Sequence, residues 1–191
     1  MFVSGFTFIR NAIKLDYPVK EAILSILPVV DEMVVAVGES DDDTRLLIES
    51  LGSKIRIIDT IWDDSLREGG KVLAVETDKA LSAVNPKADW CFYIQGDECV
   101  HEKYYDEIRA KMAFYKDNDK VDGLLFKYAH FYGSYDFLGD SKTQRASQSH
   151  YWFKSYGDFA ELVDFACWGS FIGKGLRAAC KAGLFLSQEV A

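Results

Sequence analysis

Apolar runs of strand length alternate with amphipathic stretches through about residue 115 of this chain. Long uninterrupted apolar runs are typical of strands that are covered on both faces. We expect such strands at residues 2–9, 33–37, 55–58 and 90–94. Strands that alternate with helices predict βαβ units, so the fold class is α/β with a mainly parallel central sheet.

Helical periodicity separates these runs. Val19, Ala22, Ile23, Ile26 and Leu27 recur at the spacing of one helical face, and Pro28 ends the pattern. Further helices are expected through residues 46–51, 73–84 and 104–115, with a long strand at 121–132.

Length and charge narrow the class of protein. The 191 residues suit about one domain. A formal net charge of −8 disfavours a nucleic-acid binder, which needs a basic surface. No apolar run reaches the roughly 18 residues of a membrane span, and the N-terminus shows no signal-peptide pattern. The four cysteines have no CxxC spacing, so we expect reduced thiols and a cytoplasmic location.

Polar loops follow each of the four predicted strands. Ligands of open α/β sheets bind beyond the carboxyl ends of the strands. That rule selects the loop Arg10-Asn11 and the loops at residues 38–44, 59–70 and 95–98, three of which are rich in carboxylates.

The loop Gln95-Gly96-Asp97-Glu98 is the sharpest candidate, because it follows a bulky apolar strand directly. Mg²⁺ and Mn²⁺ prefer oxygen ligands, and they often use one or two carboxylates together with substrate phosphates. The alternative is a solvated turn that only ends the strand.

Two other loops carry candidate ligand contacts. Glu39 or Asp41 could accept hydrogen bonds from a base or ribose, although acidic residues there could equally cap the following helix. Arg67 and Lys71 flank two glycines before a helix, a pattern that suits a diphosphate. A plain surface loop is the alternative for the second pair.

In order and spacing, these segments resemble family 2 glycosyltransferases with the GT-A nucleotide-sugar-binding fold, a Rossmann-like sandwich. The resemblance covers roughly residues 2–140. It is carried by Phe6-Thr7-Phe8-Ile9-Arg10-Asn11-Ala12, by the acidic loop that ends in Asp41-Asp42-Asp43-Thr44, and by residues 90–98 in place of the family's Asp-x-Asp motif.

The resemblance implies transfer of a sugar from a nucleoside-diphosphate sugar to a hydroxyl of a saccharide or lipid-linked acceptor, as in cell-surface polysaccharide biosynthesis. Glu39 or Asp41 would then contact the nucleoside, and Lys71 or Arg67 would lie near the phosphates. Arg10 would also belong to the nucleotide-sugar site. Asp97 with Glu98 would hold Mg²⁺ or Mn²⁺. The candidates for the catalytic base are Asp136, Asp140, Asp158 and Glu161, with Asp136 placed first.

Two departures from the family pattern stand out. Gln95 replaces the usual first Asp of the motif, so its carbonyl could bond only a ribose hydroxyl or a metal-bound water. Residues 141–191 match no acceptor segment, so we expect a nucleotide-sugar-binding core at 1–140 and an extension or incomplete acceptor segment of the same domain at 141–191. A sugar nucleotidyltransferase and a non-catalytic nucleotide- or sugar-binding relative remain alternatives. A location at the membrane periphery is left open, and the sequence indicates no oligomeric state.

Overall fold

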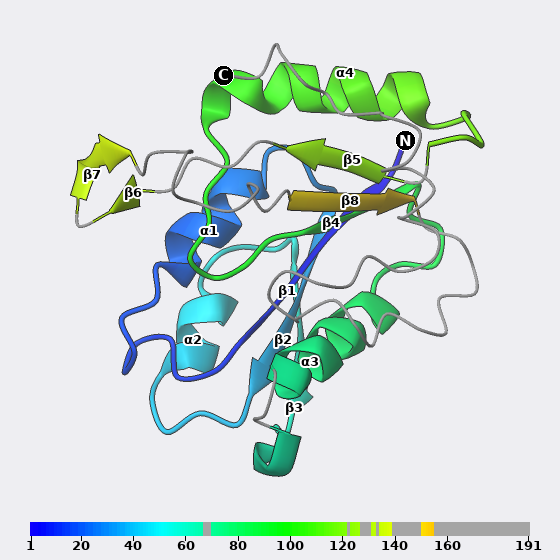
Figure 1. Cartoon of the computed structure of the whole chain (residues 1–191). Coiled ribbons are helices and arrows are strands. Elements are labelled where there is room, and N and C mark those ends of the chain that lie inside the picture. Colours follow the sequence, from blue (N-terminus) through cyan, green and yellow to red (C-terminus); the bar gives the residue numbers. More distant parts are fainter. Residues whose placement is uncertain (67–69, 122, 127–130, 133, 139–149, 155–191) are drawn as a thin grey trace.

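The structure is a computed structural model that describes residues 1–66, 70–121, 123–126, 131–132, 134–138 and 150–154 (Figure 1). A six-stranded sheet forms its centre, with the strand order β3-β2-β1-β4-β8-β5. The strands are β1 (Val3–Ile9), β2 (Glu32–Gly38), β3 (Ile55–Thr60), β4 (Trp90–Tyr93), β5 (Gly123–Phe126) and β8 (His150–Lys154).

The neighbours β3, β2, β1 and β4 pair in parallel. Strand β8 lies antiparallel between β4 and β5. The predicted α/β class with a mainly parallel central sheet is therefore confirmed. Each of the four predicted buried strands forms within one or two residues of its expected bounds.

Helices cover both faces of the sheet (Figure 1). Helices α1 (Val19–Ile26), α2 (Thr44–Glu49) and α4 (Tyr105–Tyr115) contribute to one apolar cluster, and α3 (Lys71–Ser82) contributes to the other. Because side chains alternate along a strand, Trp90 and Phe92 of β4 enter the first cluster and Cys91 enters the second. The result is the sandwich that the hydrophobic pattern predicts.

Helix α1 shows why this packing is stable. Its apolar residues Val19, Ala22, Ile23 and Ile26 share one face, and all four are fully buried against the sheet. Pro18 is the N-cap of this helix. Proline is tolerated at the start of a helix because its φ is fixed and it has no N–H that would be left unpaired.

The prediction of one strand at 121–132 is wrong. Strand β5 ends at Phe126, and Phe131–Tyr132 forms β6, which pairs with β7 (Ser134–Leu138) in a separate two-stranded sheet. Apolar and aromatic residues occur at both ends of this segment, so hydrophobicity alone does not reveal that the two ends pair with different strands.

Strand β8 was not predicted. It belongs to the segment assigned to an extension, yet it pairs with both β4 and β5 of the central sheet. The division at residue 140 stays a prediction. Within the described part of the chain, no helix combines the length and the apolar character that crossing a membrane requires.

Candidate functional site

The loops after β1, β2, β3 and β4 gather at one edge of the sheet. This arrangement results from parallel pairing, in which Ile9 lies opposite Val37 and Gly38 lies opposite Thr60. Strand β4 runs beside β1 in the same direction. The carboxyl-end rule therefore brings the predicted loops together as expected.

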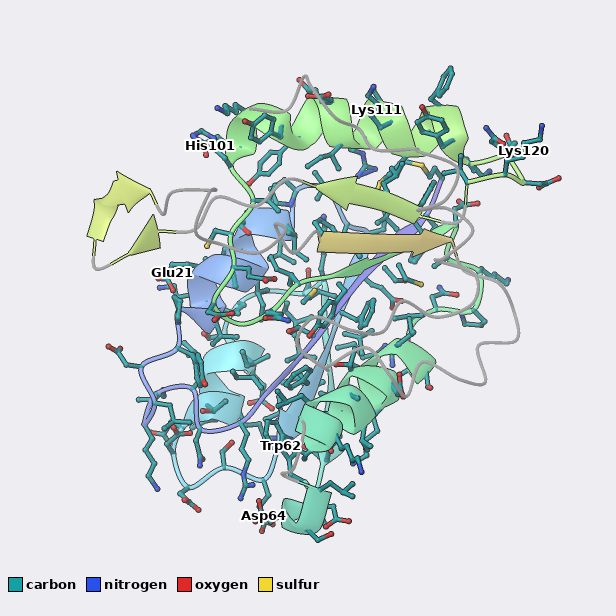
Figure 2. The ribbon with its side chains drawn as sticks, viewed as in Figure 1. Glu21, Trp62, Asp64, His101, Lys111 and Lys120 are labelled. Carbon is teal, nitrogen blue, oxygen red and sulfur yellow. The ribbon has the colours of Figure 1, made fainter. Side chains whose placement is uncertain are left out.

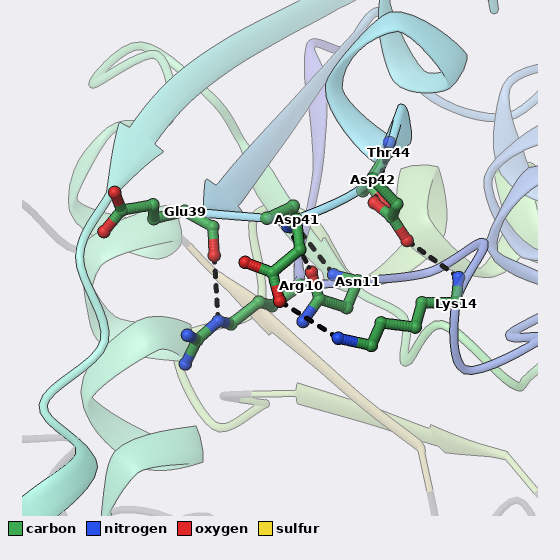
Figure 3. A network of polar contacts seen from close by, with 8 residues as sticks. Arg10, Asn11, Lys14, Glu39, Asp41, Asp42 and Thr44 are labelled. Atoms are coloured by element: carbon green, nitrogen blue, oxygen red, sulfur yellow. Dashed lines mark hydrogen bonds and ion pairs between the residues drawn. The ribbon is translucent and has the colours of Figure 1, made fainter.

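Arg10 connects three of these loops. Its Nε donates to the backbone carbonyl of Glu39 at 2.9 Å (Figure 3), and its Nη1 lies 3.4 Å from Oδ1 of Asp64. Its guanidinium carbon lies 5.7 Å from the ring centre of Trp62. One half-buried cation thus ties the ends of β1, β2 and β3 together.

A second network joins the β1 and β2 loops. The backbone N–H of Asp41 donates to Asn11 Oδ1 at 2.8 Å, and the N–H of Asn11 donates to Ser40 Oγ at 3.0 Å. Asn11 has a positive φ of 53°, which asparagine tolerates better than most residues. The exposed Asp41 carboxylate pairs with Lys14 Nζ at 3.1 Å (Figure 3).

Glu39 contributes its backbone to this arrangement. Its side chain is exposed, and its carboxylate points away from the Arg10 guanidinium in Figure 3. Its N–H donates to the carbonyl of Thr60 at 2.9 Å, which extends the pairing of β2 with β3 by one residue. Contact of the Glu39 carboxylate with a nucleoside stays a prediction.

Asp42 is the structural acid of this loop. Burial acts to raise its pKa, but hydrogen bonds from the Thr44 side chain and from the backbone N–H groups of Lys14 and Thr44 hold the pKa below its ordinary value. The distances from Asp42 to these two N–H groups are 2.7 and 3.0 Å. The capping alternative therefore describes Asp42, whereas Asp43, the N-cap of α2, makes no side-chain cap.

The loop after β4 is a compact turn. Oε2 of Glu98 accepts from the Gln95 N–H at 2.8 Å, and the Glu98 N–H lies 3.3 Å from the Gln95 carbonyl. The side chains of Gln95 and Asp97 are exposed. The turn alternative and the ligand alternative are compatible here, because Glu98 shapes the turn that presents Asp97.

The chemistry of this loop fits a hard divalent cation in part. It offers carboxylate and amide oxygens, which Mg²⁺ and Mn²⁺ prefer. Among the described residues, however, no group of three or more His, Cys, Asp or Glu side chains is placed to hold a metal ion. A cation at Asp97 would therefore need further ligands, such as phosphate oxygens.

Tyr93 lies beneath this loop at the end of β4. Burial raises the pKa of its phenol, against the effect of hydrogen bonds with Thr77 and Gln95. The phenol therefore stays protonated across the physiological range. It connects Thr77 of α3 to Gln95.

The prediction from sequence did not identify Trp62. Its indole packs against Gly38, where a Cβ atom would lie only 2.4 Å from Trp62 Nε1. Phe8 meets the same ring edge-on, with ring centres 5.8 Å apart. Trp62 and Asp64 lie together near the start of α3 (Figure 2). The signal in the sequence that could have pointed to a close contact here is Gly38, the glycine at the end of β2.

The remaining predicted residues are spread more widely. Lys71 is exposed as the first residue of α3, after Gly70 with a φ of 74°. Asp136 lies in β7, in the separate sheet. Arg67 lies outside the described residues, and so do the other three candidates for the catalytic base, Asp140, Asp158 and Glu161.

Comparison with known proteins shows similarity at the level of structure. No protein-family model matches the chain, and no curated protein matches it. Residues 1–349 of TarS from S. aureus superpose with a TM-score of 0.53 and 16% identity, over 81% of this chain and 47% of that one. The chain therefore spans about half the length of the TarS structure. The complex of the same TarS fragment with UDP gives a TM-score of 0.53 at 18% identity.

Rv0371C from Mycobacterium tuberculosis H37Rv, solved in complex with manganese, superposes with a TM-score of 0.52. Its identity is 16%, over 97% of this chain and 84% of that one. At such identities the similarity establishes the fold. The chain has the GT-A fold of nucleotide-sugar glycosyltransferases, as the resemblance implied.

Proposed function

We propose that this chain binds a nucleoside-diphosphate sugar and transfers the sugar to an acceptor hydroxyl. The observation that carries the proposal is the arrangement at the carboxyl edge of the sheet. There Arg10 ties the ends of β1, β2 and β3 together, and the loop after β4 presents an exposed Asp97. The GT-A fold supports this placement of the donor.

The nucleoside would lie along the β1 and β2 loops, with Glu39 and Asp41 as acceptors for base or ribose and Arg10 as a donor. Gln95 would meet a ribose hydroxyl. The diphosphate would lie towards Arg67 and Lys71. Arg10 and Lys14 are each paired with a carboxylate, which offsets their positive charge. The loops at this edge of the sheet therefore need further positive charge before they can hold a diphosphate.

A divalent cation would supply that charge. Asp97 would hold Mg²⁺ or Mn²⁺ with help from Glu98, and the cation would neutralise the departing diphosphate as a Lewis acid. The manganese complex of Rv0371C makes Mn²⁺ the first ion to test.

The residues of the chain would provide the proton chemistry. A carboxylate, for which we propose Asp136, would accept the proton of the acceptor hydroxyl while the oxygen attacks the anomeric carbon. The bond from that carbon to the diphosphate would break. The acceptor would be a saccharide or a lipid-linked molecule, and we propose a cytoplasmic location, at the membrane surface if the acceptor is lipid-linked.

Calorimetric titration with nucleoside diphosphates tests the proposal. UDP comes first because the TarS fragment binds it. We expect UDP or another nucleoside diphosphate to bind more tightly with Mn²⁺ than without it. Asp97→Asn should weaken the metal-dependent part at least about tenfold, the loss expected when a charged ligand contact is removed. Asp119→Asn, an equally exposed change beyond α4, is the matched control and should have no effect.

Three results would count against the proposal. If no nucleoside diphosphate binds in either condition, the site is not a nucleotide site. If Asp97→Asn binds as the wild type does, the metal assignment fails. If the chain releases pyrophosphate from a nucleoside triphosphate and a sugar phosphate, it is a nucleotidyltransferase instead.

A further inference from the structure

Glu76 is an unusual residue for the interior of this protein. It lies in the second turn of α3 and is fully buried. Its Oε1 accepts from Lys79 Nζ at 2.6 Å, whereas its Oε2 is buried without a hydrogen-bond partner among the described residues. A buried carboxylate with one oxygen unpaired lowers stability compared with a neutral side chain of similar shape.

Lys79 extends this contact from the helix to the site. Its Nζ also donates to the backbone carbonyl of Ile61 at 3.1 Å. Ile61 directly follows β3 and directly precedes Trp62. The ammonium group therefore joins a buried carboxylate on α3 to the first residue of the β3 loop.

Asp64, further along this loop, is held by Arg10 at 3.4 Å, but the polar side chains at positions 60 and 62 provide no hydrogen bond to the part of the chain that the structure describes. Thr60 Oγ1 and Trp62 Nε1 are both buried, and neither has a hydrogen-bond partner there. The bond from Lys79 to Ile61 is thus a polar contact that holds this point of the loop to α3. Trp62 in turn packs beside Arg10, which binds the Glu39 carbonyl.

We infer that Glu76 is a positioning residue for the nucleotide site, acting through Lys79 and Ile61 on Trp62 and Arg10. The inference rests on the proposed function, because the site it serves is the proposed nucleotide site. By fixing the ammonium group, the Glu76 carboxylate keeps the Ile61 carbonyl and the adjacent Trp62 in register with β2. Arg10 then has a fixed aromatic surface beside it.

The competing explanation is an ordinary ion pair at i and i+3 that stabilises only the helix. Removal of the charge separates the two explanations. An ion pair that only stabilises should lower stability when it is lost. If Glu76 is a positioning residue whose buried charge is unfavourable in the core, removing that charge should leave the free energy of unfolding equal or higher while the loop becomes more mobile.

Glu76→Gln and Lys79→Met test this directly, with Lys79→Arg as the conservative variant. The Lys79 side chain is 38% exposed, but Lys79→Met leaves the Glu76 carboxylate buried without its partner and should lower the melting temperature. The double variant Glu76→Gln/Lys79→Met removes both charges, should melt closer to the wild type, and is measured in the same way. Glu107→Gln, at a partly exposed glutamate on α4, is the matched control. Each variant is measured with and without Trp62→Phe, so that the difference isolates the fluorescence of Trp62.

We expect Glu76→Gln to melt at or above the wild-type temperature. Acrylamide quenching of Trp62 should rise about twofold in Glu76→Gln and in Lys79→Met. The Kd for UDP with Mn²⁺ should rise about fivefold to tenfold, the range expected for a residue that acts through intervening contacts. Lys79→Arg should restore both values, and Glu107→Gln should change neither.

Unchanged quenching of Trp62 in both variants would overturn the inference. So would a loss of UDP affinity that only parallels a fall in melting temperature. If the wild type binds no nucleotide, the proposed function fails. The quenching result then still decides whether Glu76 and Lys79 hold the loop.

Discussion

Replacing Gly38 with alanine is the sharpest test of how the β2 and β3 loops fit together. A Cβ atom at Gly38 would lie 2.4 Å from Nε1 and 2.8 Å from Cδ1 of Trp62, and 3.1 Å from Cβ of Arg10. Gly38 is not among the residues with positive φ. The backbone therefore accepts alanine, and the cost comes only from these contacts.

The size of the effect depends on the rigidity of the neighbours. The indole cannot yield as a terminal methyl group can, so the ring must shift as a whole. Overpacking of this kind costs about 1–3 kcal/mol. For a chain of this length each kcal/mol lowers the melting temperature by about 2–4 °C, so we expect a decrease of about 2–12 °C. The affinity for nucleotide should fall as well, because Arg10 of the proposed site packs beside Trp62.

Thermal and urea denaturation measure the change, with Gly96→Ala as the matched control. There the three atoms nearest to a new Cβ would be the terminal methyl of Ile9 at 3.2 Å and two side-chain carbons of Val19 at 3.7 and 3.8 Å. We expect a clearly smaller loss. In a Trp62→Ala background, Gly38→Ala should cost much less, since the clash is gone. An unchanged melting temperature, or an equal cost in both backgrounds, would refute the contact as the cause.

Three further changes probe other parts of the molecule. Ile23→Ala should lower the free energy of unfolding by about 2–5 kcal/mol in urea denaturation, because Ile23 is fully buried; a loss below about 1 kcal/mol would contradict the packing. Asp42→Asn should be less stable than the wild type near neutral pH, and the difference should shrink as pH falls below about 4. The reason is that a carboxylate whose pKa is lowered by folding stabilises above its unfolded pKa and loses that effect as it protonates; a difference independent of pH would contradict this. Burial raises the pKa of the Cys99 thiol, and the charges of Glu21 and Glu98 raise it further. Alkylation of Cys99 should therefore be slower than that of a free thiol at about pH 8, and it should accelerate above about pH 9. Mass spectrometry of the peptide that contains Cys99 measures this rate. Full reaction at the rate of free cysteine would contradict this shift.

Local hydrophobicity predicted the parallel half of this fold well. The runs Met33 to Val37 and Trp90 to Ile94 are apolar at nearly every position, because helices cover both faces of their strands. Parallel pairing then placed the loops at one edge without further information. Strand β8 was not predicted, because its pairing with β4 joins residues 60 to 64 positions apart.

The candidate site was predicted at the level of loops, and less well at the level of atoms. Arg10 and Asp97 lie at the expected edge. Glu39, in contrast, contributes a carbonyl and an N–H to the network, which side-chain chemistry could not indicate. Glu76 lies among helical residues with no motif around it, and a charged residue is expected on the surface. Its burial became visible only when α3 was packed on the sheet.

The late position of β8 bears on how the chain acquires its structure during synthesis. Strands β1 to β4 and their helices are complete by about residue 115, but the free side of β4 gains its partner only when residues 150–154 have been made. Until then a nascent chain exposes an unpaired strand edge at Trp90–Tyr93, next to strongly apolar side chains. Strand β5 has no place in the sheet before that moment, because β8 separates it from β4. Folding on the ribosome would therefore include an interval in which the half-made sheet is open to pairing with another chain.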